Sequence, residues 1–485
     1  LKSTNDTERF TSSVKSFEYR QEYVTFGRGI YDEESIKLRY HDGISDTELT
    51  YKNHSIVQNE LRLTLSDDIY SLDVTLVYRA FDELDMIERY AVITACGETV
   101  TIENAASANI FLPSGQNYEV MTFSGSHMRE YTPYTNIIPR GKLVFETRRT
   151  VSAGPYHVPF FTVTNTSAPC TETYGELYYG MLKYSGNFRN VFEKNQSGTV
   201  KITTGINFHD TKIELKNGES FETPTAIFGY SDSGVCGMRR NIYDLEYEKL
   251  AMRANIENPF PIIYNSWYPY FFGIEEEKLL RLIDKVADLG AELFVIDDGW
   301  MQGRTNDRAG LGDWFPDKER FPNGLLPISK KAHDKGLLFG LWVEPEMINE
   351  SSELYKEHPE WVLCYKTREK SYTRHQLVLN FAREDVYNFA QETVDRLIEE
   401  NELDYLKWDM NRYITEKDTL RDFEIKFTQN VMRLYKHIRE KYPRLTATGI
   451  RDKMIMDGFI KESDASVATF QRFIKKNNLK GASAP

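Results

Sequence analysis

The spacing of apolar residues changes near Pro261, and this change limits the folds open to the chain more than any other feature. Before it, apolar and polar residues alternate with a period of two in many short runs, as at 72–78, which predicts strands with one buried face. Similar runs lie at 90–94, 100–102, 160–163, 177–182, 200–202 and 213–215. Strands at such short intervals, separated by Gly, Asn and Ser, are typical of an antiparallel β-sandwich. We therefore expect a β-sandwich over residues 1–240.

After Pro261 the pattern becomes one of apolar strands separated by helices. Strands are predicted at 262–267, 292–296, 337–343 and 404–408, and helices at 275–289, 326–335, 386–401 and 419–441. Such alternation is typical of a parallel α/β domain. We expect a connecting helix or linker at 241–258, helical to about residue 254, followed by a TIM-type (β/α) barrel at 259–485.

The length of the second half is too short for a complete barrel. About 40 residues follow Thr446, whereas three further βα units need about 90 residues, at about 30 each. We expect an incomplete barrel that is truncated after about the fifth strand. A barrel of this length indicates either a truncated or frame-shifted copy or a chain that a partner completes. The chain begins at Leu1 with neither an initiator Met nor a hydrophobic signal core, so we expect it not to be the whole gene product. Assembly of the chain into a homo-oligomer stays an open alternative.

Charge and composition exclude several classes of protein. The net charge is −13, with 60 Lys and Arg against 73 Asp and Glu. This charge disfavours sequence-independent binding to nucleic acid. No apolar run approaches the roughly 20 residues that a membrane span needs. The four cysteines are widely spaced, which favours free thiols and the cytoplasm. Five Asn-x-Ser/Thr sequons matter only in the alternative that the protein is secreted.

Acidic residues follow three of the predicted parallel strands. They are Asp297 and Asp298, Glu344 and Glu346, and Asp409. Because the carboxyl ends of all strands of a parallel barrel open onto one face, these acids are expected to converge. The Asp-Gly pair at 298–299 is, by itself, equally well explained as a turn. Four tryptophans close by, whose rings suit the CH face of a pyranose, favour a sugar site; they are Trp267, Trp300, Trp342 and Trp408.

The last of these strands ends in Lys407, Trp408 and Asp409. Strand alternation places Lys407 and Asp409 on the same side, with Trp408 opposite. An ammonium beside a carboxylate favours the ionised form that a nucleophile needs. The alternative is a structural ion pair between the two.

Six blocks of sequence in the second half resemble the family-36 glycoside hydrolases, the retaining α-galactosidases. They are NSWYPYFF (265–272), LFVIDDGW (293–300), LGDWFPDKERFPNGL (311–325), FGLWVEPEMI (339–348), HPEW (358–361) and YLKWDMNR (405–412). The first half is similar to the large β-sandwich of that family more loosely, through 175–177 and 184–187. The resemblance implies hydrolysis of terminal α-galactosyl groups from melibiose- or raffinose-type sugars.

The resemblance also implies roles for individual residues. Asp409 would be the nucleophile, and Asp297 and Asp298 would accept hydrogen bonds from the galactose 4- and 6-hydroxyls. Trp267 and Trp342 would wall the pocket, and the remaining hydroxyls would be bound by Arg374, Lys407 and Asn411. We assign no sugar contact to Glu344 and Glu346 and expect them to form a salt-bridged frame. No cofactor or metal is implied, because no His/Cys cluster has ligand spacing.

The general acid of the family has no clear counterpart in this sequence. In the family it is an Asp within a Cys-Ser-Gly-Gly-Gly-Arg-x-Asp segment two strands after the nucleophile, and no such segment occurs here. Asp452, after Gly449-Ile-Arg451, is a weak match that lies too early in the chain. Two alternatives to an active hydrolase follow: a galactose-binding remnant without the acid, and a galactosyltransferase of the raffinose-synthase type.

Overall fold

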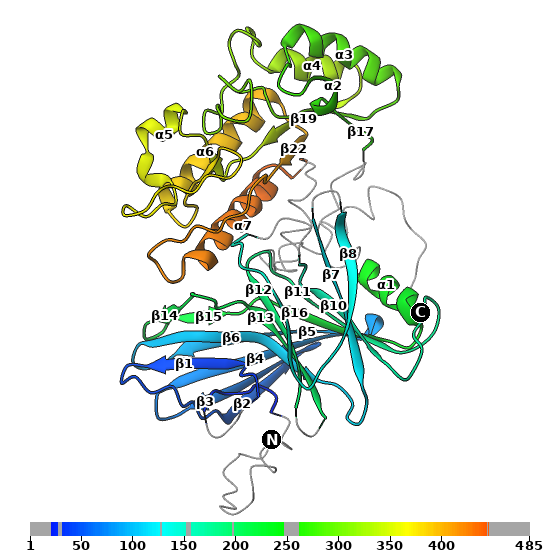
Figure 1. Cartoon of the computed structure of the whole chain (residues 1–485), viewed down its shortest axis with the longest axis vertical. Helices are drawn as coiled ribbons and strands as arrows, with labels where there is room; N and C mark the ends of the chain where they lie inside the picture. Colours follow the sequence, from blue (N-terminus) through cyan, green and yellow to red (C-terminus); the bar gives the residue numbers. More distant parts are fainter. Residues whose placement is uncertain are drawn as a thin grey trace, which may run out of the picture. The chain divides into compact units, whose positions relative to one another are not determined.

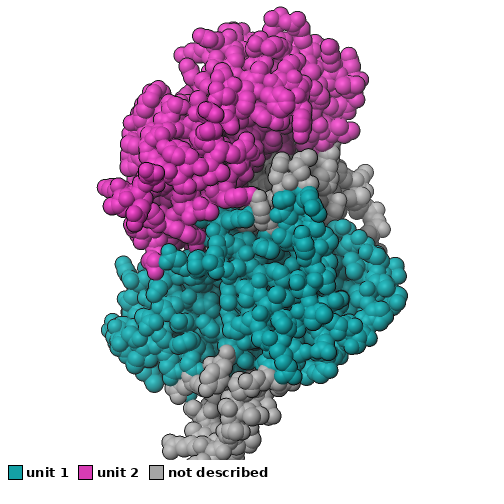
Figure 2. All heavy atoms as spheres, viewed as in Figure 1, with its two compact units in different colours: residues 1–250, 456–458 teal, residues 251–455, 459–485 magenta. Residues whose placement is uncertain are grey.

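The computed structural model describes residues 21–27, 32–126, 129–151, 157–195, 198–246, 261–443 and 445. The chain forms two compact units, one of residues 1–250 with 456–458 and one of residues 251–455 with 459–485 (Figures 1 and 2). Asp452, most of the predicted linker and the tail after 445 lie outside the described residues. The domain boundaries given above therefore stay a prediction.

The first unit is built from antiparallel sheets, as the period-two pattern predicts. Its strands are β1 (Ile36–Tyr40), β2 (Thr50–Val57), β3 (Glu60–Asp67), β4 (Leu72–Phe81), β5 (Met86–Ala95), β6 (Val100–Phe111), β7 (Tyr118–Ser126), β8 (Arg129–Ile137), β9 (Gly141–Glu146), β10 (Phe160–Asn165), β11 (Leu177–Leu182), β12 (Phe188–Lys194), β13 (Val200–Ile206), β14 (Ile213–Leu215), β15 (Ser220–Glu222) and β16 (Ala226–Ser231). One sheet has the order β1-β6-β13-β12, and the larger sheet has the order β2-β3-β4-β5-β16-β11-β10-β7-β8 (Figure 1).

The core of this unit lies between the two sheets. The alternate residues Leu72, Val74 and Leu76 of β4 are at most 1% exposed, because successive side chains of a strand point to opposite faces. Phe161 of the larger sheet meets Phe192 of the smaller one edge-on, with ring centroids 5.0 Å apart. Such aromatic pairs add to the stabilisation that burial alone provides.

The helix α1, near the end of this unit, starts earlier than the sequence predicts. We expected a helix from about residue 241 to 254, whereas α1 spans Gly234–Asp244 and residues 247–254 are outside the described part. The first turn of α1 contains two glycines, which have low helix propensity. Tertiary packing overrides this propensity: a Cβ on Gly237 would lie 2.3 Å from the Ser231 hydroxyl oxygen, and Met238 is buried in the core cluster beneath the helix.

The second unit contains a parallel sheet of four strands within the part that the structure describes. The strands are β17 (Ile263–Asn265), β18 (Leu293–Ile296), β19 (Leu338–Val343) and β22 (Tyr405–Trp408), in that spatial order. The helices are α2 (Trp267–Tyr270), α3 (Glu276–Asp288), α4 (Leu326–Asp334), α5 (Glu353–Glu357), α6 (Glu384–Asn401) and α7 (Phe423–Lys441). A separate antiparallel pair joins β20 (Met347–Ile348) to β21 (Leu377–Val378). The four described strands form an open sheet, consistent with an incomplete barrel.

Two boundaries in this unit differ from the predicted ones because polar side chains end or delay an element. Trp267 was expected within a strand, but the Asn265 side chain accepts the Trp267 backbone N–H at 2.8 Å and turns the chain into α2. Helix α7 begins at Phe423, not at Thr419. There the Asp418 carboxylate accepts the N–H of Leu420 and holds a turn before the helix.

Two expectations concerning cysteines and membranes can be compared with the structure. All four cysteines lie in the described residues and are free thiols, as their spacing predicts. None of the helices described has both the length and the apolar composition to cross a bilayer.

Candidate active site

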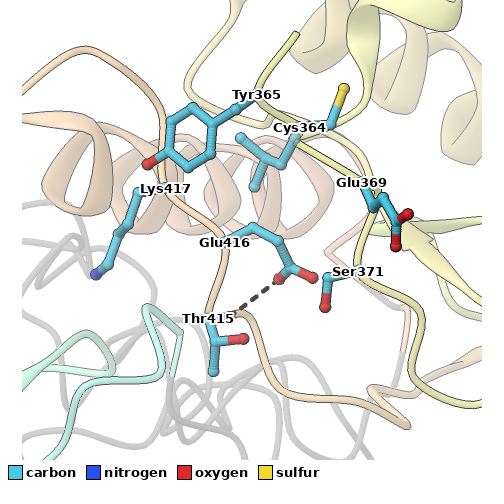
Figure 3. Close-up of a pocket in the computed structure, with 8 residues that line it drawn as sticks. Cys364, Tyr365, Glu369, Ser371, Thr415, Glu416 and Lys417 are labelled. Carbon is cyan, nitrogen blue, oxygen red and sulfur yellow. Dashed lines mark hydrogen bonds between the residues drawn. The ribbon is translucent and has the colours of Figure 1, made fainter. Parts of the chain in front are cut away.

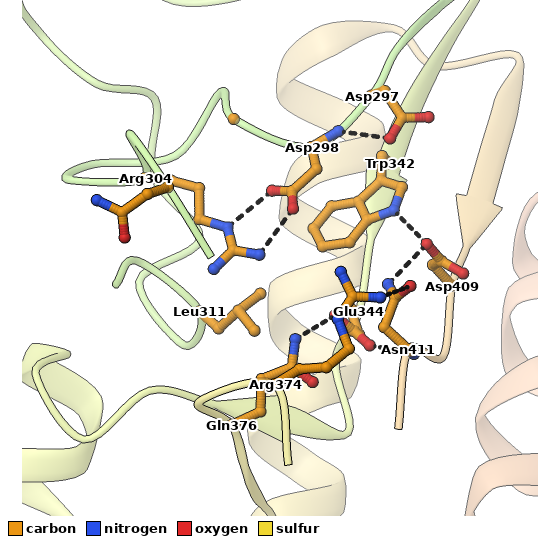
Figure 4. Close-up of polar contacts among 12 residues, drawn as sticks. Asp297, Asp298, Arg304, Leu311, Trp342, Glu344, Arg374, Gln376, Asp409 and Asn411 are labelled. Carbon is orange, nitrogen blue, oxygen red and sulfur yellow. Dashed lines mark hydrogen bonds and ion pairs between the residues drawn. The ribbon is translucent and has the colours of Figure 1, made fainter. Parts of the chain in front are cut away.

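The carboxyl ends of β18, β19 and β22 bring the predicted acidic residues to one edge of the parallel sheet (Figure 4). Ile296 is in register with Leu341, and Val343 is in register with Trp408. The residues that follow these pairs therefore leave the sheet at similar heights. The convergence of strand ends, which the sequence predicts, is confirmed in this arrangement.

Asp409 is held by three N–H donors. Its Oδ2 accepts hydrogen bonds from Trp342 Nε1 at 2.9 Å and from Asn411 Nδ2 at 2.8 Å. Its Oδ1 accepts the backbone N–H of Met410 at 2.9 Å, and its own N–H donates to Val343 O at 2.8 Å. The carboxylate is therefore fixed in one orientation at the end of β22 while it stays partly exposed.

Lys407 forms its ion pair with Asp297 and not with Asp409. Its Nζ donates to Asp297 Oδ2 at 2.5 Å, and the Asn265 side chain donates to the same oxygen. The direct ammonium–carboxylate pair at 407 and 409 that strand alternation suggested is thus not formed. The lysine side chain is long enough to extend across the ends of the strands to Asp297, which follows β18. Asp297 is only 3% exposed.

Asp298 is bound on both oxygens by Arg304, a residue that the sequence did not single out. Nε and Nη2 of Arg304 donate to Oδ1 and Oδ2 of Asp298 at 2.8 and 2.7 Å. Arg304 is 1% exposed and also donates to Ala309 O and Asn349 Oδ1. Burial raises the pKa of Asp298, and Arg304 opposes that shift. A sequence signal for this pair is lacking, because arginine in a loop is common.

The two tryptophans that were expected to wall the pocket differ in accessibility. Trp342 is 1% exposed, and its ring centroid lies 6.3 Å from that of Trp314. Its indole N–H donates a hydrogen bond to Asp409 Oδ2. In this structure it supports the nucleophile candidate and is not an open sugar platform. Trp267 is half-buried and meets Phe271 and Phe272 edge-on.

Arg374 reaches the site from a loop with unusual backbone angles. Its Nη1 donates to Asn411 Oδ1 at 2.8 Å, and Arg374 itself is exposed. Arg374 and His375 have φ values of +52° and +59°, which L-residues adopt only at a cost in free energy. The site residues predicted at 374 and 411 are therefore in contact.

Glu344 and Glu346 do not have the same surroundings, and the salt-bridged frame expected for them is wrong for Glu344. Glu344 is fully buried and accepts the backbone N–H of Asn411 on Oε1 and the Gln376 side-chain N–H on Oε2. Burial, with a contribution from Asp409, raises the pKa of Glu344 to about 8. Glu346 accepts a hydrogen bond from Trp408 Nε1 at 2.8 Å.

A cavity of about 220 Å³ lies beside the loop that follows Asn411 (Figure 3). It is lined by Leu363, Cys364, Tyr365, Glu369, Ser371, Thr415, Glu416 and Lys417. Arg412 connects this region to the strand-end acids, because it donates to Gln376 O and forms an ion pair with Glu416. The predicted sugar-site residues are not part of the cavity lining.

Comparison with known proteins places this site in a family. Residues 2–216 match the family model described as Glycosyl hydrolase family 36 N-terminal domain, and residues 220–451 match the model described as Melibiase. The chain belongs to glycoside hydrolase family 36. Among curated family-36 relatives, alpha-galactosidase AgaA of Geobacillus stearothermophilus is 35% identical over 416 residues, which are 82% of this chain and 56% of the relative. Alpha-galactosidase 2 of Pediococcus pentosaceus is 34% identical, over 84% of this chain and 58% of its own.

Solved structures of alpha-galactosidases agree with the fold. The crystal structure of AgaA has a TM-score of 0.83 and 32% identity, covering 88% of this chain and 63% of its own. The alpha-galactosidase from Lactobacillus brevis has a TM-score of 0.85 and 29% identity, covering 94% and 66%. Variants of AgaA have been crystallised with raffinose and with stachyose. This chain spans a little over half the length of the curated relatives it matches.

Proposed function

We propose that this chain carries the nucleophile and galactose-binding half of a retaining α-galactosidase that acts on terminal α-galactosyl groups of raffinose-type sugars. The main support is the setting of Asp409, a partly exposed carboxylate at a strand end, fixed by Trp342 and Asn411. Membership of family 36 and the alpha-galactosidase relatives support the substrate class.

In the proposed reaction, an Asp409 oxygen attacks the anomeric carbon and the bond from that carbon to the leaving oxygen breaks. The leaving group takes a proton from a general acid, and a covalent galactosyl–enzyme ester forms. Water then attacks the same carbon and gives a proton to the conjugate base of the general acid, the ester bond to Asp409 breaks, and galactose is released with its anomeric configuration retained.

Specificity for galactose is proposed to come from Asp297 and Asp298. Asp297 Oδ2 already accepts from both Lys407 and Asn265. Asp297 Oδ1, which accepts the Asp298 N–H, and the two Asp298 oxygens, which accept from Arg304, are left to take a further hydrogen bond from a sugar hydroxyl, because a carboxylate oxygen has two lone pairs. Glucose would leave these buried acceptors unpaired, which a site of this kind penalises strongly. Trp267, Arg374 and Asn411 are proposed to contact the rest of the ring.

The printed sequence contains no match to the segment that carries the general acid of the family. We therefore expect this chain to cleave nitrophenyl α-galactoside, whose leaving group needs little protonation, much faster than melibiose, whose leaving group needs a proton. Initial rates on the two substrates measure this difference, and the nitrophenyl β-galactoside serves as the control that should not react. Equal rates on both α-galactosides would mean that a general acid is present.

A second candidate is a galactose-binding protein that does not cleave the glycosidic bond, which the missing acid segment also favours. Binding of galactose by calorimetry without release of nitrophenol would select this candidate. Failure to bind galactose and to cleave either α-galactoside would contradict both proposals.

A further inference from the structure

Glu344 is a fully buried carboxyl group at the end of β19, between two residues of other elements (Figure 4). Its Oε1 accepts the backbone N–H of Asn411, which follows β22. Its Oε2 lies 3.2 Å from Nε2 of Gln376, which precedes β21. Glu344 thus connects the loop that follows β22 to the residue that precedes β21.

The contact with Asn411 connects Glu344 to the proposed nucleophile. The Asn411 side chain donates from Nδ2 to Asp409 Oδ2 and accepts from Arg374 on Oδ1. The position of this amide depends on the backbone of residue 411, and Glu344 holds that backbone. A shift of Glu344 would therefore move a hydrogen bond that orients Asp409.

The charges around Glu344 disfavour its ionised form. The negative groups that face it are Asp409 and Asp298. The nearby cations are engaged elsewhere: Arg304 with Asp298, Lys407 with Asp297, Arg412 with Glu416 and Arg374 with Asn411. Among the described residues Glu344 has no ion-pair partner, so a further buried negative charge there is unfavourable, in agreement with the raised pKa of Glu344.

Gln376 provides a second, independent observation. It is 1% exposed, and among the described residues its Oε1 has no hydrogen-bond partner. An ionised Glu344 can only accept hydrogen bonds, whereas a neutral carboxylic acid also has one O–H to donate. In the structure the Gln376 amide donates its N–H to Glu344 Oε2. A half-turn of this amide exchanges its nitrogen and oxygen, so that the oxygen lies opposite Glu344 Oε2, where the O–H of a neutral Glu344 would bind it, and the N–H groups take the present place of Oε1.

We propose that Glu344 is a positioning residue that works as a neutral carboxylic acid, accepting the Asn411 N–H on one oxygen and donating its O–H to Gln376. In this form it fixes the Asn411 amide against Asp409 without adding a charge to the acids of the site. The protonated state is independent of the activity of the chain, whereas the benefit for Asp409 rests on the proposed function.

The protonated state is tested by the pH dependence of unfolding in the Glu344→Gln variant. Between pH 4.5 and about 8 the folded chain keeps this proton and the unfolded chain has lost it. The free energy of unfolding of the unaltered chain therefore falls as the pH rises through this window. Glutamine removes this contribution. The slope of the free energy of unfolding against pH should therefore be less negative in the variant, by the amount that corresponds to about one bound proton. Urea unfolding at several pH values measures the slopes.

The matched control is Glu384→Gln on α6. Arg433 lowers the pKa of the Glu384 carboxyl, so this carboxyl loses its stabilising charge only below the window, and the slope between pH 4.5 and 8 should not change. The same dependence of the free energy of unfolding on pH in the unaltered chain and in Glu344→Gln would overturn the proposal. Loss of the native fold in Glu344→Gln would also overturn it, because glutamine reproduces the shape and hydrogen bonds of the neutral acid.

The proton can also be observed directly, and the positioning role has its own readout. At neutral pH the infrared spectrum should contain the carbonyl stretch of a buried protonated carboxyl, and Glu344→Gln should lose that band. Glu344→Ala should release nitrophenol from nitrophenyl α-galactoside about tenfold or more slowly than Glu344→Gln. Equal rates for these two variants would contradict positioning; a chain that neither binds nor cleaves galactosides but keeps the band would contradict only the proposed function.

Discussion

Replacing Arg304 by Met is expected to lower the free energy of unfolding by about 3–5 kcal/mol, since it leaves a buried carboxylate without its partner. Both groups are almost inaccessible, with 1% of the Arg304 side chain and 11% of the Asp298 side chain exposed. The two hydrogen bonds between them hold the loop after β18 to the edge of the sheet. Urea unfolding at neutral pH, followed by circular dichroism, measures the change.

Two variants separate the buried ion pair from a general effect of removing an arginine. Arg281→Met removes an exposed arginine of α3 that pairs with an exposed glutamate, and its effect should stay within about 0.5 kcal/mol. In the double variant Asp298→Asn with Arg304→Met, part of the lost stability should return, because no unpaired charge stays buried. A loss below about 1 kcal/mol for Arg304→Met would show that the pair is not a structural element.

Replacing Asp409 by Asn is expected to slow the cleavage of nitrophenyl α-galactoside by roughly 10⁴-fold or more, because the nucleophile is lost. The variant should still fold and bind galactose, since an amide oxygen can accept the N–H groups of Trp342 and Asn411 that now meet Asp409 Oδ2. The hydrogen bond from the Met410 N–H to Oδ1 is lost, because the amide nitrogen that replaces Oδ1 cannot accept it. Single-turnover kinetics and calorimetry with galactose measure the two properties.

The control for this prediction is Asp288→Asn at the exposed end of α3, which should leave both the rate and the affinity unchanged. An Asp409→Asn variant that cleaves at the unaltered rate would mean that another group attacks the sugar. A variant that loses galactose binding together with activity would mean that Asp409 acts mainly in binding.

The four parallel strands and the longer helices α3, α4, α6 and α7 of the second unit follow from its sequence, whereas α2, α5, β20 and β21 were not predicted. Helix α3 buries Leu279, Ile283 and Val286 on one face, and all four residues of β18 are buried, as expected for a strand of a covered parallel sheet. Parallel strands also bring their carboxyl ends together, so the sequence predicts the convergence of Asp297 and Asp409.

The pairing within the site does not follow from the sequence. Lys407 lies two residues before Asp409 but forms its ion pair with Asp297. Distance along the sequence does not determine this pairing, because the long lysine side chain can reach acids on neighbouring strands. Arg304 and Gln376 come from loops without a distinctive pattern, and the burial of Trp342 depends on the packing of Trp314. The roles of the site residues, the domain boundaries, a cytoplasmic location and a homo-oligomer stay predictions.

Covalent trapping tests the central claim most directly, namely that Asp409 attacks the anomeric carbon of an α-galactoside. A fluorinated α-galactosyl fluoride has a leaving group that needs little protonation, and its ring fluorine slows hydrolysis of the ester that forms. Intact-mass spectrometry followed by peptide mapping should find one fluorogalactosyl group per chain, attached to Asp409. An adduct on another carboxylate, or no adduct from a chain that demonstrably binds galactose, would contradict the assignment.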